Sequence, residues 1–188
     1  MTNTVFLSWT TNEPTQFWVL GRYIHSVGIL AAILFAERKN FPALLTLLLL
    51  FFSAGGIALI ALGLFPDAFL AGSGLTPFKI ASEYFTAAIF GLSIYLIMER
   101  PLTGKKETNY AFARSLLCFM LVAFVFTTYF HTDGFSSITG HLLYFLGAYI
   151  LLTGFILPYS QELLDIHFFA LNNKIRRLNR NLEDRVRK

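Results

Sequence analysis

Apolar residues dominate five blocks of the chain, and each block is as long as a membrane-spanning helix. The blocks cover roughly residues 15–36, 41–64, 78–98, 110–129 and 138–157, with polar turns or segments rich in proline and glycine between them. An α-helix rises about 1.5 Å per residue, so about 20 residues cross a hydrocarbon core of roughly 30 Å. The pattern predicts an all-α integral membrane protein with about five transmembrane helices.

The segment after Pro158 has a different pattern. Its apolar residues are spaced alternately by four and three positions, which is the heptad pattern of a coiled coil. Such a seam is buried against a second helix, so the pattern predicts a homodimer. An amphipathic helix lying on anionic lipid is the alternative interpretation. The seam residues are Leu164, Phe168, Leu171, Ile175, Leu178 and Leu182.

Composition supports a membrane domain rather than a soluble one. Apolar residues make up 55% of the 188 positions and charged residues 14%, and the mean hydropathy is +0.59. A soluble domain carries about 25% charged residues. The basic pI, near 9.3, does not indicate nucleic-acid binding, because the positive charges cluster beside the apolar blocks. The single cysteine, Cys118, excludes an intrachain disulfide.

The positive charges orient the predicted bundle. A five-helix path that alternates in direction places thirteen of the fifteen Lys and Arg residues on one side of the membrane. They follow the first, third and fifth helices, and the positive-inside rule makes that side cytoplasmic. The N-terminus and the loop 66–77 are then expected outside. We therefore predict a membrane domain over residues 1–158 and a cytoplasmic signalling helix over residues 159–188.

Two charged residues lie well inside predicted helices. Arg22 is about seven residues, or roughly 10 Å, into the first helix from its outer end, and Glu83 lies at a similar depth in the third. Isolated charges at that depth are costly, so both are expected to face the bundle interior and to pair. The pair either serves helix packing alone or lines an outward-facing ligand pocket.

Further polar residues belong to the same outer half of the bundle. His25 lies one turn below Arg22 on the same helix face, and Lys79 lies one turn before Glu83. Tyrosines, including Tyr84, are expected to surround them. The predicted ligand-binding or switch residues are Arg22, His25, Lys79, Glu83, Tyr84 and His141.

Histidine and carboxylate side chains also suit a transition metal. The candidate ligands are His25, His131, Asp133 and His141, and a haem between His25 and His141 is a related alternative. No pair of them has the close spacing typical of a metal-binding motif, so we expect no resident metal or cofactor. The sequence also contains no kinase nucleotide-binding region, cyclase active-site motif or receiver aspartate pocket, and we expect no enzymatic activity from this chain.

Motifs in all five predicted helices follow a recognisable order. The most specific are the segments 63–69 (GLFPDAF), 74–80 (GLTPFKI) and 82–84 (SEY). The others are 14–18 (PTQFW), 22–23 (RY), 126–127 (FT) with Tyr129, 134–136 (GFS) and 140–142 (GHL). Together they resemble the third family of bacterial membrane-associated sensor domains, which stand at the N-terminus of histidine kinases and diguanylate cyclases.

The sequence departs from the pattern of this family in two ways. Family members usually have about two further helices before the PTQFW segment, and these are absent from this sequence. Ala123 stands near the position of an acidic residue in the fourth helix, and Tyr144 stands where a lysine is common. The resemblance implies the bacterial inner membrane as the location and implies no ligand common to the family.

These observations predict a membrane-embedded sensory input domain. A stimulus in the outer half of the bundle would pass through the fifth helix and the dimeric seam to a cytoplasmic output domain outside this sequence, a histidine kinase or a diguanylate cyclase. Membrane lipid and a second copy of the chain are the expected partners, and nucleic acid is not. A metal- or haem-binding membrane redox protein and a small transporter are the alternatives.

Overall fold

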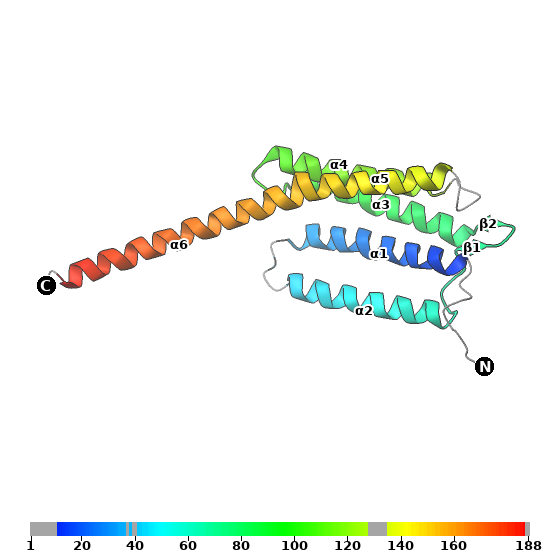
Figure 1. The fold of residues 1–188 in the computed structure, drawn as a ribbon, viewed down its shortest axis with the longest axis horizontal. Helices are drawn as coiled ribbons and strands as arrows, with labels where there is room; N and C mark the ends of the chain where they lie inside the picture. The colour runs from blue at the N-terminus through cyan, green and yellow to red at the C-terminus, as the bar shows by residue number, and fades with distance from the viewer. Residues whose placement is uncertain (1–10, 37, 39–40, 128–134, 187–188) are drawn as a thin grey trace.

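The computed structural model describes residues 11–36, 38, 41–127 and 135–186, with side chains as far as Leu178. Its elements in chain order are α1 (Asn12–Leu34), α2 (Phe41–Ala61), β1 (Phe69–Leu70), β2 (Gly74–Leu75), α3 (Pro77–Glu99), α4 (Lys106–Val125), α5 (Phe135–Leu151), the π-helical segment η1 (Leu152–Ile156) and α6 (Leu157–Val186). Helices α1 to α5 lie side by side, and α6 extends beyond them at the end opposite to the two strands (Figure 1).

Within the described residues, five helices are long and apolar enough to cross a membrane, which confirms the predicted fold class. The fifth candidate span continues without interruption from Phe135 to Leu178. The fourth helix begins at Lys106, four residues before its predicted start. The Asn109 side chain explains this earlier start, because it accepts hydrogen bonds from the amides of Leu102 and Thr103 and thereby fixes the polar loop against the first helical turn.

The core of the bundle lies between α1, α3, α4 and α5. Its fully buried members include Phe90, Leu116 and Phe119, with Ile97 toward the basic end. Helix α2 packs against α1 and contributes only Gly56 and Ile60 to the buried residues. The exposed apolar side chains of α2 are what a lipid-facing helix requires, because hydrocarbon is then its solvent.

The breaker-rich segment predicted to lie outside the membrane forms a short hairpin. Strand β1 pairs antiparallel with β2, and the turn uses Gly72 and Gly74 at positive φ, a conformation that glycine adopts readily. The Asn12 side chain at the start of α1 holds this hairpin. Its Oδ1 accepts from the amides of Ala68 and Phe69 at 2.8 and 3.0 Å. The segment that carries the hairpin is therefore fastened to α1.

Helices α5 and α6 form one continuous helical rod, joined by η1. The local reason is Pro158, which lacks an amide hydrogen and whose ring crowds the carbonyl four residues earlier, so the preceding turn widens into a π-helix instead of ending. A stack of Phe112, Phe155 and Tyr159 rings holds this turn against α4, with centroids 4.2 and 5.5 Å apart. The rod thus leaves the bundle from a fixed point.

Three glycines at seven-residue intervals form the face of this rod that meets α4. A Cβ added to Gly140 would lie 2.7 Å from the Phe126 ring, and one on Gly147 would lie 2.9 Å from the Phe119 ring. A Cβ on Gly154 would lie 2.6 Å from the Ala111 Cβ. Small residues allow such close approach of helices within a membrane, where packing replaces the hydrophobic effect as the source of association.

Candidate functional site

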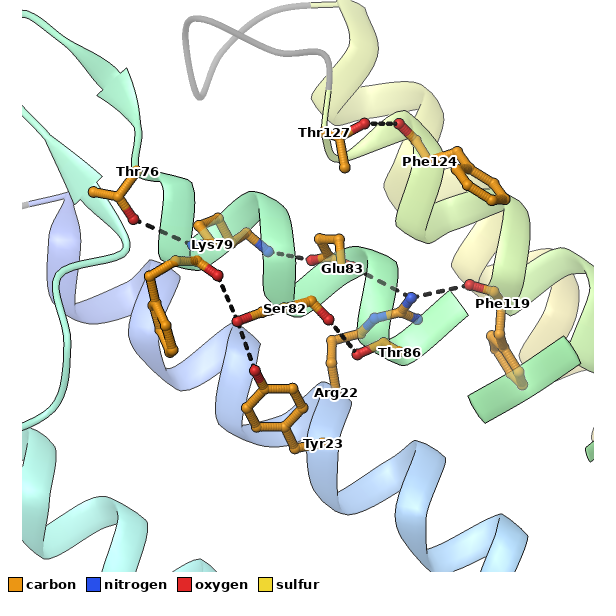
Figure 2. A network of polar contacts seen from close by, with 11 residues as sticks. Arg22, Tyr23, Thr76, Lys79, Ser82, Glu83, Thr86, Phe119, Phe124 and Thr127 are labelled. Atoms are coloured by element: carbon orange, nitrogen blue, oxygen red, sulfur yellow. Dashed lines mark hydrogen bonds and ion pairs between the residues drawn. The ribbon is translucent and has the colours of Figure 1, made fainter. Parts of the chain in front are cut away.

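Three charged side chains meet in the half of the bundle that lies toward the hairpin of β1 and β2. Figure 2 shows Arg22 reaching from α1 toward Glu83 on α3, with Lys79 one turn before Glu83 on the same helix. Glu83 Oε2 lies 3.5 Å from Arg22 Nη2, and Glu83 Oε1 accepts a hydrogen bond from Lys79 Nζ. The side chains of Arg22, Glu83 and Lys79 are 3%, 1% and 0% exposed, respectively. The pairing of Arg22 with Glu83 that helix depth predicts is present.

Arg22 also connects this pair to α4. Its Nη2 donates to the backbone carbonyl of Phe119 at 3.0 Å, and its guanidinium lies 5.3 Å from the centre of the Phe90 ring. A charged donor gives a stronger hydrogen bond than a neutral one, especially away from water. A single side chain from α1 therefore binds both α3 and α4.

A second set of hydrogen bonds supports the charged residues from α1 and α3. Tyr23 donates its hydroxyl hydrogen to Ser82 Oγ at 2.6 Å, and Ser82 donates to the carbonyl of Phe78 at 2.7 Å (Figure 2). Thr76 caps α3 by accepting from the Lys79 amide. These bonds fix the positions of Lys79 and Glu83 along the first two turns of α3.

Replacing Tyr23 with phenylalanine is expected to destabilise the bundle by about 1 kcal/mol, the net contribution of one hydrogen bond. Thermal unfolding in detergent micelles measures this difference. Tyr84→Phe is the matched control, because the Tyr84 side chain is 52% exposed and packs against the Phe124 ring. Equal midpoints for Tyr23→Phe and the parent would show that the hydroxyl contact adds nothing to stability.

Among the described residues, the buried charged side chains comprise two cations and one carboxylate. Burying a charge is costly unless it is paired and hydrogen-bonded, and Glu83 pairs with both cations at once. The cluster therefore retains one excess positive charge. This environment favours a group of negative charge nearby.

The other predicted site residues lie in different surroundings. His25 packs among the rings of Phe90, Phe119 and Tyr144, with centroids 5.5, 4.6 and 6.0 Å away. His141 lies in the second turn of α5, and its Nδ1 is 2.7 Å from the carbonyl oxygen of Ser137. Neither imidazole has a hydrogen bond to Arg22, Lys79 or Glu83 in the described part of the chain.

Tyr84 does not belong to the buried cluster, contrary to its predicted place around it. Successive residues of a helix are rotated by about 100°, so the residue after Glu83 faces away from it. Its half-exposed ring contacts Phe124 instead.

The described residues offer no set of ligands for a metal ion. Over residues 11–36, 38, 41–127 and 135–186, no group of three or more His, Cys, Asp or Glu side chains gathers in a way that suits a metal ion. Two of the candidate ligands, His131 and Asp133, lie outside the described residues.

Trp18 was not among the predicted site residues, and it extends the site toward the beginning of α1. Its ring contacts Phe126, His141 and Tyr144, with centroids 5.0, 5.2 and 5.5 Å away. The available signal was spacing, because residues 18, 22 and 25 are four and three positions apart and therefore share one face of α1. A cavity of about 270 Å³ lies beside Trp18, where α1 begins and α5 begins.

Comparison with protein families gives one match that covers most of the chain. The family model for MASE3, a membrane-associated sensor domain, matches residues 1–158. Comparisons with curated proteins and with solved structures give no match.

Proposed function

Because this chain belongs to the MASE3 family of membrane-associated sensor domains, we propose that it receives a stimulus in the outer half of its bundle and transmits it to a cytoplasmic output domain. The output domain is a histidine kinase or a diguanylate cyclase encoded beyond this sequence. This role requires no catalytic residue, resident metal or cofactor in the chain itself.

The observation that carries the proposal is the path from the charged cluster to the rod formed by α5, η1 and α6. Arg22 binds the carbonyl of Phe119 on α4, and the Phe119 ring contacts Tyr144 on α5 at a centroid distance of 5.2 Å. The rod then continues to Val186 without a break. A rearrangement of the charges moves α4 against the rod, and the rod carries the movement out of the membrane.

The distribution of basic residues supports an inner-membrane orientation with α6 in the cytoplasm. The α1–α2 connection, the α3–α4 connection and α6 lie toward one end of the bundle, and the hairpin of β1 and β2 lies at the other (Figure 1). Arg38, Arg100, Lys105 and Lys106 belong to the first end. The positive-inside rule then places that end in the cytoplasm and the N-terminus outside.

We further propose that α6 pairs with α6 of a second copy. Seam residues Leu171, Ile175 and Leu178 are each about half exposed in the single chain, and the positions between them are polar. Nearer the membrane, Leu163, Ile166 and Phe169 are exposed apolar residues off the seam, as suits a helix still at the lipid interface. The segment that specifies pairing therefore begins at about Leu171.

Cysteine crosslinking in membranes tests this pairing. In a Cys118→Ser background, Leu171→Cys is expected to form a disulfide-linked dimer readily, because seam residues of paired helices face each other. Asn173→Cys is the matched control on the opposite helix face and is expected to crosslink poorly. Equal crosslinking at both positions, or none at Leu171, would contradict the seam.

A chimera tests the sensory role. The chain is fused in heptad register to a kinase output, and activity is measured in membranes for the parent, Arg22→Ala, Glu83→Ala and the double variant. If the charges act as one switch, each single variant shifts output and the double variant shifts it no further than the singles do. Parental output from all three, at normal protein levels, would limit the charges to a packing role.

A further inference from the structure

Three residues on one face of α1 carry buried nitrogens without a hydrogen-bond partner in the described part of the chain. The atoms are Trp18 Nε1, Arg22 Nε, Arg22 Nη1 and His25 Nδ1. Buried polar groups are nearly always hydrogen-bonded, and an unpaired one is costly, most of all on a charged side chain. Trp18 Nε1 and the two Arg22 nitrogens are donors, so their presence on one helix face indicates a site for a molecule that accepts hydrogen bonds.

The charge of the surroundings restricts that molecule further. Arg22 is 3% exposed, and two of its three guanidinium nitrogens are buried without a hydrogen-bond partner among the described residues. The third nitrogen is shared between Glu83 and the Phe119 carbonyl. Lys79 is completely buried, so the described cluster has one more cation than carboxylates. An anion would neutralise this excess, and it would also give Trp18 Nε1 the acceptor that it lacks.

A cavity provides a place for the body of such a molecule. It has a volume of about 270 Å³ and lies where α1 begins, α4 ends and α5 begins. Lining residues include Thr11, Thr15, Trp18, Phe126, Ser137 and His141. The aromatic rings among them meet at steep angles, with interplanar angles of 73° between Trp18 and Phe126 and 81° between Phe126 and His141. Aromatic walls favour a small aromatic body, because aromatic rings pack edge to face against one another.

The two cations of the cluster lie close to residues that line the cavity. Lys79 Nζ is 5.8 Å from the centre of the Phe126 ring, and Arg22 follows Trp18 by one helical turn, a rise of roughly 6 Å. Charges buried in a medium of low dielectric constant act over such distances with little screening. Aromatic rings therefore form part of the cavity wall, and the positive charge of the cluster lies close to it.

We propose that this cavity binds a small organic anion with a flat apolar body, of the aromatic carboxylate class. Its ring lies against the contacting rings of Trp18, Phe126 and His141, and its carboxylate accepts from Trp18 Nε1. Arg22 and Lys79, which do not line the cavity, balance the carboxylate charge through its wall. The assignment rests on the proposed sensory function and adds the ligand class to it. Because Ser137 and His141 belong to α5, an occupant touches the transmitting rod directly.

Fluorescence titration of Trp18 tests the proposal. The protein contains two tryptophans, so Trp9→Phe leaves Trp18 as the single reporter. In lipid nanodiscs, benzoate is expected to change Trp18 emission saturably, and the neutral isostere benzamide is expected to bind at least about tenfold more weakly. Arg22→Met is expected to weaken benzoate binding by a similar factor, because a buried charge partner is lost.

A cavity-filling pair of variants keeps the test independent of Arg22. Ser137→Leu places a larger side chain in the cavity and is expected to abolish benzoate binding, whereas Ser136→Leu changes the neighbouring serine, which does not line it. Equal affinity for benzoate and benzamide, the absence of saturable binding, or unchanged binding in Ser137→Leu would overturn the assignment. Binding is read without an output domain, so its failure leaves the chimera result intact, and a failed chimera leaves the binding result intact.

Discussion

Glu83→Gln is expected to destabilise the bundle by about 3–5 kcal/mol, the cost of leaving buried charge without its partner. Glu83 is the carboxylate between Arg22 and Lys79, and all three side chains are buried. Glutamine keeps the size of the side chain but leaves two cations facing each other without a counter-charge. Chemical or thermal unfolding in detergent micelles, followed by helical circular dichroism, measures the loss.

Arg22→Met is the informative comparison, and we expect it to cost less than half as much as Glu83→Gln. The remaining Lys79 and Glu83 still neutralise each other on adjacent turns of α3. Methionine also fills much of the volume left by the arginine. The two losses would be equal if the geometry of the individual contacts, rather than the balance of charge, governed stability, and that result would also weaken the argument for an anionic ligand.

Gly154→Ala is expected to destabilise the protein by about 2 kcal/mol, as overpacking a close helix contact does. The added Cβ would lie 2.6 Å from the Cβ of Ala111, which is attached to the backbone and cannot rotate away. Helix propensity alone predicts the opposite sign, because alanine favours a helix by about 1 kcal/mol over glycine. The same micelle unfolding assay decides between packing and propensity.

The double variant Gly154→Ala with Ala111→Gly isolates the contact. It removes the opposing Cβ, so most of the lost stability is expected to return, with a coupling energy of about 1 kcal/mol or more. Gly55→Ala is the control on α2, where an added Cβ meets nothing within 4 Å. If Gly154→Ala is as stable as Gly55→Ala, the rod does not approach α4 as closely as described. In the chimera, Gly154→Ala is expected to shift basal output, because it displaces the rod where it leaves the bundle.

Part of the site could be predicted from the sequence because membrane physics leaves few choices. Arg22 and Glu83 lie at similar depth in apolar helices. Burying either charge alone costs several kcal/mol, so the two are expected to pair with each other. The surroundings of these residues could not be predicted in the same way. Tyr84 is adjacent to Glu83 in sequence and faces away from it, whereas Phe119, far along the chain, supplies a carbonyl to Arg22.

The rod and its glycine face show the same division. The sequence predicted a helix before Pro158 and another after it, but only the structure shows that the turn before the proline widens and the helix continues. The seven-residue interval of Gly140, Gly147 and Gly154 is visible in the sequence. Its meaning depends on the residues opposite each glycine, and these come from a different helix.

The sequence by itself determined the number of spans, their order, their direction relative to the basic residues and the need for the buried charges to pair. These features depend on the contrast between apolar and polar positions along one chain, because apolar segments partition into the hydrocarbon core and charged segments stay outside it. Only the tertiary structure decided which helices touch, which buried nitrogens lack a hydrogen-bond partner and where the cavity lies. Lipid and protein interior are both apolar, so hydrophobic pattern does not distinguish a lipid-facing helix surface from a packed one, and shape complementarity between helices makes that choice.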